Sequence, residues 1–417
     1  MSIERIVIVD GARTPIGSFG GSLSSIPAHE LGAVAVAEAM RRSDIEPSDV
    51  EEVVMGCIGQ VGADAYNARR VAIAAGIPTS VPAFTVNRLC GSGLQAIWSA
   101  AQEMRWSGLD LAVAGGDESM SRMPFYDFAA REGRRLGDRT LTDGTVAMLT
   151  DPFGGTHMGV TAEAVAEKYN VSREEQDDFA LTSQQRAASA RSRTAFADEI
   201  IEVEIGGRHP AVVALDEHPK PDTTTEILAA LRPAFRAGGS VTAGNASGIN
   251  DGAAAVVLAT ESVARERGHT GLVALEHVAT AAIEPGLMGY APTYALRSLL
   301  DRTGLAVADI DIVELNEAFA SQAVAVSRDV GLDPERTNPY GGAIRPGPSG
   351  RGDWHHPDTA RRQALASDRR RARDRHDVHR WWAGAGSPLP ATRLKEVRET
   401  ERVPRFRIEA RYPCGRE

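Results

Sequence analysis

The chain has 417 residues, of which 42% are hydrophobic and 24% are charged, values that are ordinary for a soluble globular protein. This length suggests two domains, or one large layered unit with insertions. The three cysteines, Cys57, Cys90 and Cys414, have no paired spacing, which argues for a reducing compartment and against a disulfide framework or a zinc site. No apolar run reaches membrane-spanning length, and a strand pattern starts at once from Arg5 to Asp10, so we expect a cytoplasmic protein without a leader segment.

The net charge of −10 is divided unevenly along the chain. Residues 345–417 contain 18 Lys and Arg against 10 Asp and Glu, so the first 344 residues contain 28 against 46. Three of the five tryptophans also lie in this last segment. The change in composition at residue 345 therefore needs a separate explanation.

Apolar runs alternate with helical patterns from the start of the chain to about Ser121. Strands are expected at Ile6–Val9, Val53–Ile58, Val81–Val86 and Leu111–Ala114, and helices at Ala28–Met40, after Asn67, and from Gly91 to about Met104. Strands that alternate with helices imply a mostly parallel sheet covered on both faces. From about Arg122 to Val241 this rhythm weakens, and loops surround two predicted helices, Thr161–Lys168 and Arg173–Ala190.

A second copy of the alternating pattern follows this insertion. A strand is expected near Val273–Leu275, and another at Ile310–Leu315 leads into a helical pattern at Asn316. Two similar α/β halves, each contributing one reactive group, would account for this arrangement.

Cys90 stands where an apolar run gives way to a helical pattern. The run Val81–Val86 ends at Asn87, and Gly91 and Gly93 follow the cysteine. At such a turn the free N–H groups and the helix dipole favour a thiolate, and the glycines let a substrate carbonyl approach the backbone donors. Two interpretations remain open on these residues alone: a nucleophile, or a buried structural cysteine with glycines that allow tight packing.

Several segments, in a fixed order, resemble those of the thiolases, enzymes that make or cleave 3-ketoacyl-CoA. The resemblance covers roughly Ile6 to Ile344. Each segment alone is a weak signal, but their order and spacing are specific. The segments are Asn87-Arg-Leu-Cys-Gly-Ser-Gly-Leu-Gln-Ala96, Gly116-Asp-Glu-Ser-Met-Ser121 (where the family usually has Met in second place), His157-Met-Gly159, Gly244-Asn-Ala-Ser-Gly248, Asn316-Glu-Ala-Phe319 and Asn338-Pro-Tyr-Gly-Gly-Ala-Ile344.

The resemblance implies a thiolase-like α/β fold, with two similar halves of mixed sheets and layered helices plus a loop insertion. The N-terminal domain would span residues 1–268, with the insertion at about 122–241. Residues 269–344 would begin the C-terminal domain.

The resemblance also implies two catalytic residues. Cys90 would take the acyl group from an acyl-CoA as a thioester, which splits one hard condensation into two easier steps. Asn316 would hold a water in the oxyanion pocket of the bound thioester. The alternative for Asn316 is a helix N-cap.

Four further residues are candidates for CoA binding by the same resemblance. His157 would line the pantetheine tunnel, and Ser247 would hydrogen-bond the pantetheine amide. Lys220 lies where the family often has an arginine near the CoA nucleotide, and Phe319 is expected to serve packing more than chemistry. The alternatives are a surface histidine, an ordinary turn serine and an exposed lysine without function. The sequence has no phosphate-binding glycine loop followed by Lys-Ser/Thr, so CoA thioesters would bind as substrates through scattered contacts, with no cofactor or metal.

The family pattern stops after Ile344. A thiolase would continue with an Ala-Leu-Gly-His-Pro segment, whose histidine activates the cysteine, and later with Cys-Ile-Gly-Gly-Gly, whose cysteine removes a proton from the second acyl-CoA. This chain reads Arg345-Pro-Gly-Pro-Ser-Gly350, and its only later cysteine is Cys414. The expected acid–base pair is therefore absent.

A frameshift explains both the lost motifs and the changed composition. Permitted codons for residues 345–359, read one base later, encode Ala-Leu-Gly-His-Pro-Val-Gly-Ala-Thr-Gly, with the histidine across Pro348 and Ser349. The same frame over 377–386 permits Thr-Cys-Ile-Gly-Gly-Gly-Gln-Gly-Leu, with the cysteine across Val378 and His379. We interpret residues 345–417 as out-of-frame translation, from a real frameshift or a sequencing error, and expect this tail to pack poorly.

These observations predict an acyl-CoA C-acyltransferase that condenses acetyl-CoA or cleaves 3-ketoacyl-CoA, with little activity in this chain. We expect a homodimer or homotetramer with acyl-CoA substrates and no nucleic-acid or membrane partner. A non-catalytic acyl-CoA-binding protein of the same fold is the alternative. A genuine basic tail, with Arg369–Arg373 and Trp381-Trp382, would instead suggest nucleic acid or anionic lipid as a partner.

Overall fold

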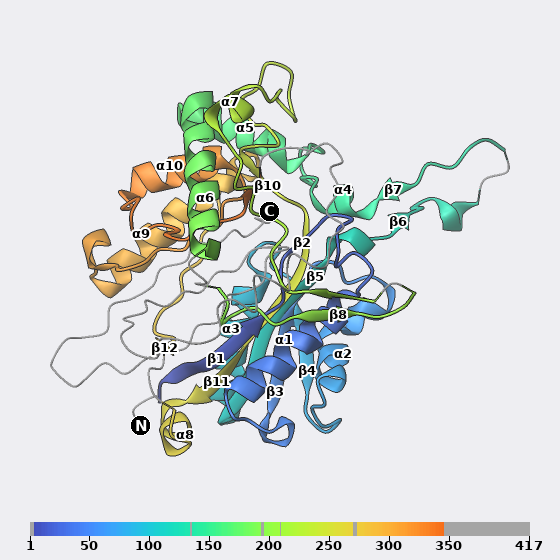
Figure 1. Ribbon diagram of the computed structural model, residues 1–417, viewed down its shortest axis with the longest axis vertical. Coiled ribbons are helices and arrows are strands. Elements are labelled where there is room, and N and C mark those ends of the chain that lie inside the picture. The colour runs from blue at the N-terminus through green and yellow to red at the C-terminus, as the bar shows by residue number, and fades with distance from the viewer. Residues whose placement is uncertain (1–3, 134–135, 193–195, 209, 270–272, 346–417) are drawn as a thin grey trace.

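The computed structural model describes residues 4–133, 136–192, 196–208, 210–269 and 273–345. The expectations for the tail beyond Arg345, including the frameshifted motifs and Cys414, lie outside these residues. The described chain has two parts: a sheet with helices on both faces, and a group of helices at one end of it (Figure 1).

A mixed sheet forms the first part. Its seven strands are β1 (Ile6–Arg13), β2 (Gly17–Ser18), β3 (Glu52–Gly56), β4 (Ala83–Val86), β5 (Leu111–Ser119), β11 (Asn250–Thr260) and β12 (Val273–Ala274). The strand order is β12-β1-β11-β5-β3-β4, with β2 paired to β11. β3 is parallel to β4 and β5, whereas β11 is antiparallel to β1, β2 and β5, and β12 is antiparallel to β1. The prediction of a mostly parallel sheet is therefore wrong, because β11 returns from the insertion and enters the sheet between β1 and β5.

Helices cover both faces of this sheet. α1 (Ala28–Arg42) and α2 (Asn67–Ala74) pack on one face, and α3 (Ser92–Ser107) packs on the other. Every residue of β11 is buried; Ala255 and Val257 contact the core under α1, whereas Val256 and Leu258 contact the core under α3. The almost continuous apolar run of this strand follows from burial on both faces.

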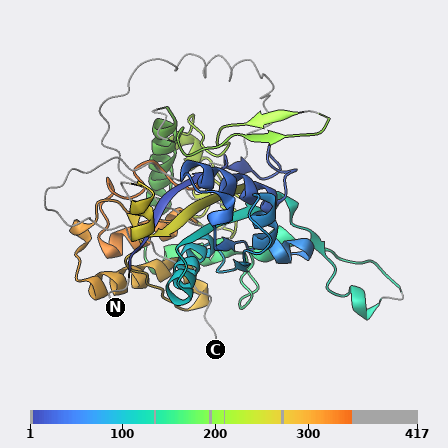
Figure 2. The ribbon, with the colours of Figure 1, turned by 90° about the horizontal axis from the view of Figure 1, so that it is seen from below.

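The insertion between β5 and β11 forms helices and hairpins outside the sheet. The two predicted helices are confirmed as α5 (Met158–Lys168) and α6 (Arg173–Ser192). The sequence did not indicate the shorter elements, which are β6 (Phe125–Tyr126) with β7 (Thr142–Asp143), α4 (Gly144–Met148), β8 (Val203–Ile205) with β9 (Ala211–Val213), and α7 (Thr225–Ala229). Both hairpins project from the rest of the molecule (Figure 2).

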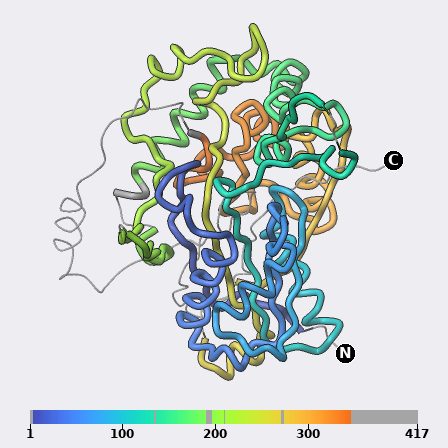
Figure 3. Tube along the Cα trace, turned by 90° about the vertical axis from the view of Figure 1, so that its right-hand side faces the viewer, coloured from blue at the N-terminus to red at the C-terminus, as the bar shows by residue number. Residues whose placement is uncertain are grey.

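The helical part combines the insertion with the C-terminal half of the described chain. α5 packs with α9 (Ala291–Thr303) and α10 (Ala320–Val330) around a separate core that includes Val165, Leu296 and Val326. Figure 3 shows these green and orange segments together, with the blue segments of the sheet below them. The short α8 (Glu261–Glu266) connects β11 to β12.

The second copy of the alternating pattern differs from its prediction within the described residues. β12 forms at the expected position but pairs with β1 of the first sheet. The expected strand Ile310–Leu315 is reduced to a single bridge, Val313 with Thr337. The last strand, β13 (Ile344–Arg345), pairs with β10 (Ala246–Ser247) in the helical part. The described part of the second half therefore contributes helices and loops around the site instead of a second large sheet.

Candidate active site

Cys90 lies on a tight turn between β4 and α3. Leu89 has a φ of 46°, a left-handed conformation that is uncommon and strained for a bulky residue. The turn is held by its own side chains: the Ser92 hydroxyl accepts the N–H of Arg88 at 2.8 Å and donates to the carbonyl of Leu89 at 2.7 Å. The Asn87 side chain also accepts the N–H of Leu89 at 3.0 Å. These bonds present the half-buried Cys90 just before the first turn of α3, where the helix dipole favours a thiolate.

Two glycines in the sheet allow this turn to lie against the strand ends. Gly56 of β3 and Gly116 of β5 are neighbours in the parallel pairing. A Cβ at Gly56 would collide with the backbone of Ser92, and one at Gly116 would lie 3.3 Å from the Cα of Gly93. The start of α3 therefore occupies space that any larger residue at position 56 would take.

Cys57 has a different environment from Cys90. It is buried at 1% exposure, and burial, followed by the nearby carboxylates of Glu118 and Asp117, raises the pKa of its thiol well above the ordinary value. A thiol in this environment stays protonated and unreactive. Of the two cysteines that the structure describes, Cys90 is the one suited to act as a nucleophile.

His157 belongs to a stack of three aromatic rings. Its Nδ1 accepts the N–H of Gly159 at 3.0 Å and so caps α5, and its ring stacks on Phe235 with centroids 4.8 Å apart. Phe235 in turn meets Phe319 edge to face at 5.9 Å. Desolvation lowers the pKa of His157, which favours a neutral ring.

Phe235 was not found from the sequence. The signals in the sequence were an isolated aromatic residue in a polar, proline-containing stretch and the glycine at position 159. In the structure, a Cβ at Gly159 would collide with the Phe235 ring.

Ser247 lies between two of the other motif segments. Its N–H donates to the carbonyl of Ala318 at 2.9 Å, and it pairs with Ile344 between β10 and β13. Its hydroxyl donates to the carbonyl of Gly248 at 3.3 Å. The Gly244–Gly248, Asn316–Phe319 and Asn338–Ile344 segments therefore meet around this serine.

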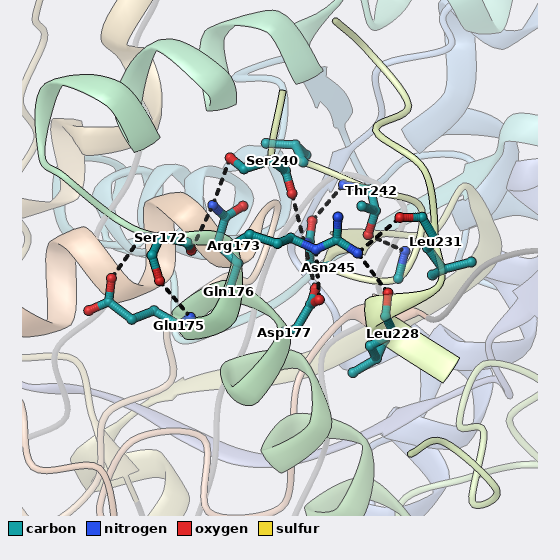
Figure 4. Close-up of polar contacts among 12 residues, drawn as sticks. Ser172, Arg173, Glu175, Gln176, Asp177, Leu228, Leu231, Ser240, Thr242 and Asn245 are labelled. Carbon is teal, nitrogen blue, oxygen red and sulfur yellow. Dashed lines mark hydrogen bonds and ion pairs between the residues drawn. The ribbon is translucent and has the colours of Figure 1, made fainter. Parts of the chain in front are cut away.

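Asn245 anchors the loop that carries Ser247 (Figure 4). Its side chain is fully buried; its Oδ1 accepts the N–H of Thr242 at 2.8 Å, and its Nδ2 donates to Asp177 at 2.9 Å and to the carbonyl of Ser240 at 3.2 Å. Arg173 donates to the other oxygen of Asp177 at 2.7 Å. Asn245 thus holds the loop in place through its side chain. Ser247, two residues later, contacts the neighbouring segments at Ala318 and Ile344.

Asn316 lies in the loop before α10. The N-cap of α10 is Phe319, so the alternative of Asn316 as a helix N-cap is wrong. The carbonyl of Asn316 accepts from Gln322 at 3.1 Å. The residue as a whole is half-buried.

Lys220 is half-buried, and its backbone N–H donates to Gln184 at 2.8 Å. The Gln184 side chain also donates to the carbonyl of Ile344. This contact connects the Lys220 loop to the last described strand.

The comparisons with known proteins agree with this geometry. The family model for the N-terminal domain of thiolase matches residues 6–262, and the model for the C-terminal domain matches residues 269–350. The chain belongs to the thiolase family. The predicted resemblance, the α/β fold class and the thiolase type of enzyme are thereby confirmed at the level of the family.

Individual thiolases are similar over most of their length. Beta-ketothiolase BktB of Cupriavidus necator is 47% identical over 344 residues, which are 82% of this chain and 87% of that protein. A probable acetyl-CoA acyltransferase of Staphylococcus epidermidis is 45% identical over 345 residues, 82% of this chain and 88% of that protein. The crystal structure of the Bacillus anthracis acetyl-CoA acetyltransferase superposes with a TM-score of 0.81 at 41% identity, covering 83% of this chain and 88% of that one. The crystal structure of the human mitochondrial 3-ketoacyl-CoA thiolase superposes with a TM-score of 0.79 at 40% identity, covering 83% of this chain and 89% of that one.

The structure brings three of the predicted site residues of this thiolase together. His157 and Phe319 share the ring stack through Phe235, and Ser247 lies beside the loop of Asn316 and Phe319. Cys90 lies in the sheet part, and the Lys220 loop is connected to Ile344 through the Gln184 side chain. Within the described ranges, no cluster of three or more His, Cys, Asp or Glu side chains could hold a metal ion, and no helix is both long and apolar enough to cross a membrane.

Proposed function

We propose that Cys90 of this thiolase takes an acyl group from an acyl-CoA as a thioester, and that the family activity is acyl-CoA C-acyl transfer with acetyl-CoA as the small substrate. The observation that carries the proposal is the position of Cys90, half-buried on a strained turn directly before α3. In this step the thiolate attacks the acyl carbonyl, a C–S bond to Cys90 forms, and CoA leaves as a thiolate that takes up a proton. Asn316 would hold a water against the thioester oxygen as negative charge develops on it.

The ring stack and Ser247 support the assignment of a pantetheine site. The rings of His157, Phe235 and Phe319 offer apolar surface, and the Ser247 hydroxyl and a neutral His157 offer isolated polar groups, a combination that is typical of small-molecule sites. Lys220 is the candidate partner of the CoA nucleotide. CoA thioesters would serve as substrates, without a cofactor.

The end of the chain limits this activity. The activating histidine and the second cysteine of the family are missing from the sequence after Ile344. In support of a frameshift near this point, the match to the C-terminal family model stops at residue 350, and the relatives match over 344 or 345 residues while 12–13% of their own length stays unmatched. We infer that condensation by the 417-residue chain is nearly absent, since positioned acid–base groups contribute about 10²–10⁴-fold each.

We further propose a homodimer or homotetramer that acts in the cytoplasm. Phe125 and Phe128, which lie in or next to the β6–β7 hairpin, are exposed, and a second copy of the chain could cover them. The cysteine spacing supports a reducing compartment. We also propose that the N-terminal domain ends near residue 268.

Intact-mass measurement after incubation with acetyl-CoA tests the proposal. Because the activating histidine is missing from the sequence, we expect a slow gain of one acetyl group over a long incubation, and this gain should disappear in Cys90→Ser. A protein that retains acetyl-CoA but gains no mass would be the non-catalytic binder, which is the alternative function. Iodoacetamide at limiting dose should also label Cys90 before Cys57, and the reverse order would contradict the assignment of the nucleophile.

A further inference from the structure

The loop that carries Asn316 is held by the side chain of Asn338, at a position where the backbone of a neighbouring strand would be expected. The backbone of Val313 pairs with Arg336 and Asn338: its N–H donates to the Arg336 carbonyl and its carbonyl accepts the Asn338 N–H, both at 2.9 Å. At Leu315 the side chain of Asn338 replaces the backbone partner. Its Oδ1 accepts the Leu315 N–H at 2.7 Å, and its Nδ2 donates to the Leu315 carbonyl at 2.8 Å.

Asn338 also reaches the residue on the other side of Asn316. Its Nδ2 donates to the carboxylate of Glu317 at 2.7 Å, so that the same amide contacts both neighbours of Asn316. Asn338 can do this because its backbone has a φ of 44°, a left-handed conformation that asparagine tolerates better than most residues. The side chain is 3% exposed, and so the bonds are shielded from competing water.

Glu317 connects this clamp to the last described residues. The other carboxylate oxygen accepts from the Ser183 hydroxyl at 2.6 Å and from the Ile344 N–H at 3.4 Å. A Cβ at Gly342 would collide with the carboxylate, so this glycine allows the close approach. The Asn-Glu-Ala-Phe and Asn-Pro-Tyr-Gly-Gly-Ala-Ile segments are therefore parts of one buried polar cluster.

We propose that Asn338 is a positioning residue for Asn316, and that Glu317 assists it: the Asn338 amide fixes the backbone on both sides of Asn316 and thereby aims its side chain at the thioester oxygen. The inference rests on the role proposed above for Asn316. Asn338 contacts the loop on both sides of Asn316 and acts only through it.

Two glycine variants separate this role from a general effect on folding. Asn338→Gly keeps the left-handed backbone accessible and removes only the amide. Asn170→Gly is the matched control, since Asn170 is exposed, has a φ of 50° at the end of α5, and lies outside the cluster. The rate of Cys90 acetylation is measured by intact mass over a range of acetyl-CoA concentrations, and alkylation of Cys90 by iodoacetamide is measured alongside.

For Asn338→Gly we expect the maximal acetylation rate to fall about 10- to 10²-fold, because misplacing a catalytic group by about 1 Å costs up to about 10²-fold. The half-saturating acetyl-CoA concentration and the alkylation rate should stay at wild-type values, and Asn170→Gly should match wild type throughout. Equal losses of acetylation and alkylation would show a general structural effect and overturn the proposal, as would an unchanged acetylation rate.

If the wild-type protein forms no acetyl thioester, the positioning role of Asn338 can still be tested by amide hydrogen exchange. The amides of residues 315–319 should exchange about tenfold faster in Asn338→Gly than in Asn170→Gly, in line with the loss of about one hydrogen bond. Faster exchange confined to this loop would support the positioning role although the proposed function had failed. Unchanged exchange would overturn it.

Discussion

Cys90, the proposed nucleophile, and Asn316, the residue proposed to hold the water, lie in two regions of the molecule that are held in different ways. The Cys90 turn is bonded by its own neighbours, Asn87 and Ser92, and lies on the sheet at a position that Gly56 leaves open. The Asn316 loop depends on a side chain more than twenty residues later, Asn338, and on α6 through Ser183. The turn of the proposed nucleophile is therefore specified by local sequence, whereas the loop of the proposed oxyanion residue depends on long-range polar contacts next to the segment where the family pattern stops.

Gly56→Ala tests the nucleophile side and should have the largest effect on stability. The added Cβ would meet the backbone of Ser92 and Gly93, which cannot rotate away as a side chain can. We expect a loss of about 3 kcal/mol in the free energy of unfolding, with loss of Cys90 acetylation. Gly286→Ala is the control, because a Cβ there meets open space. Equal urea midpoints for the two variants would show that the turn does not need this clearance.

Asn245→Ala tests the other region. The substitution leaves the buried Thr242 N–H and the Oδ1 atom of Asp177 without the hydrogen bonds that Asn245 makes to them. We expect the free energy of unfolding, measured in urea, to fall by about 2–3 kcal/mol. Alkylation of Cys90 should be unaffected, since the change lies in the helical part. Thr182→Ala removes an exposed hydroxyl of α6 and serves as the control. If Asn245→Ala slowed alkylation of Cys90 as well, the two regions would not be independent.

Asp117, at the position where thiolases usually have Met, makes the sheet part sensitive to pH. Burial raises the pKa of Asp117 to about 8, although the Asn67 amide at 2.6 Å favours the charged form. Below about pH 4 the folded and unfolded chains both hold this proton; between about pH 4 and pH 8 only the folded chain does. The stabilising effect of this proton is therefore complete at low pH and is lost as pH rises.

The variant Asp117→Asn should remove this dependence. We expect wild type to lose roughly 1–2 kcal/mol relative to the variant between pH 6 and pH 7.5, since each pH unit is worth at most about 1.4 kcal/mol. Glu118, whose pKa burial raises to about 7, is present in both proteins and leaves a common residual slope. Parallel curves of unfolding free energy against pH would contradict a protonated Asp117.

Phe235→Leu should have the smallest effect of these substitutions, and it should act on the binding of acetyl-CoA. The leucine keeps apolar volume but loses the ring contacts to His157 and Phe319. Such contacts contribute about 0.5–1.5 kcal/mol in addition to the free energy gained by burying the apolar surface. The half-saturating concentration of acetyl-CoA should rise about 2- to 10-fold at an unchanged maximal rate. Phe128→Leu also removes a stacked ring, against Tyr126 at 5.5 Å, but outside the site. A similar shift in both variants would contradict the assignment of Phe235 to the proposed pantetheine site.

The same contrast explains what could be predicted from the sequence. The Cys90 turn, α1, α3, α5 and α6 follow from local patterns, and the order of the motif segments was enough to predict the family. The position of β11 was not predictable, because the alternating pattern does not reveal that a strand after a long insertion enters the sheet between β1 and β5. The strand expected at Ile310–Leu315 failed because a side chain, Asn338, takes the place of a backbone partner. Phe235 was missed because its ring partners are distant in sequence.

The most direct test compares condensation of acetyl-CoA by two proteins: the 417-residue chain, and the chain encoded after deletion of one base at the start of the Arg345 codon. We expect the second protein to form acetoacetyl-CoA and the first to be slower by several orders of magnitude, because the histidine and the second cysteine return together and each acid–base group contributes about 10²–10⁴-fold. Equal rates would show that the 417-residue chain already contains its acid–base groups, and would contradict both the frameshift and the division of the site described here.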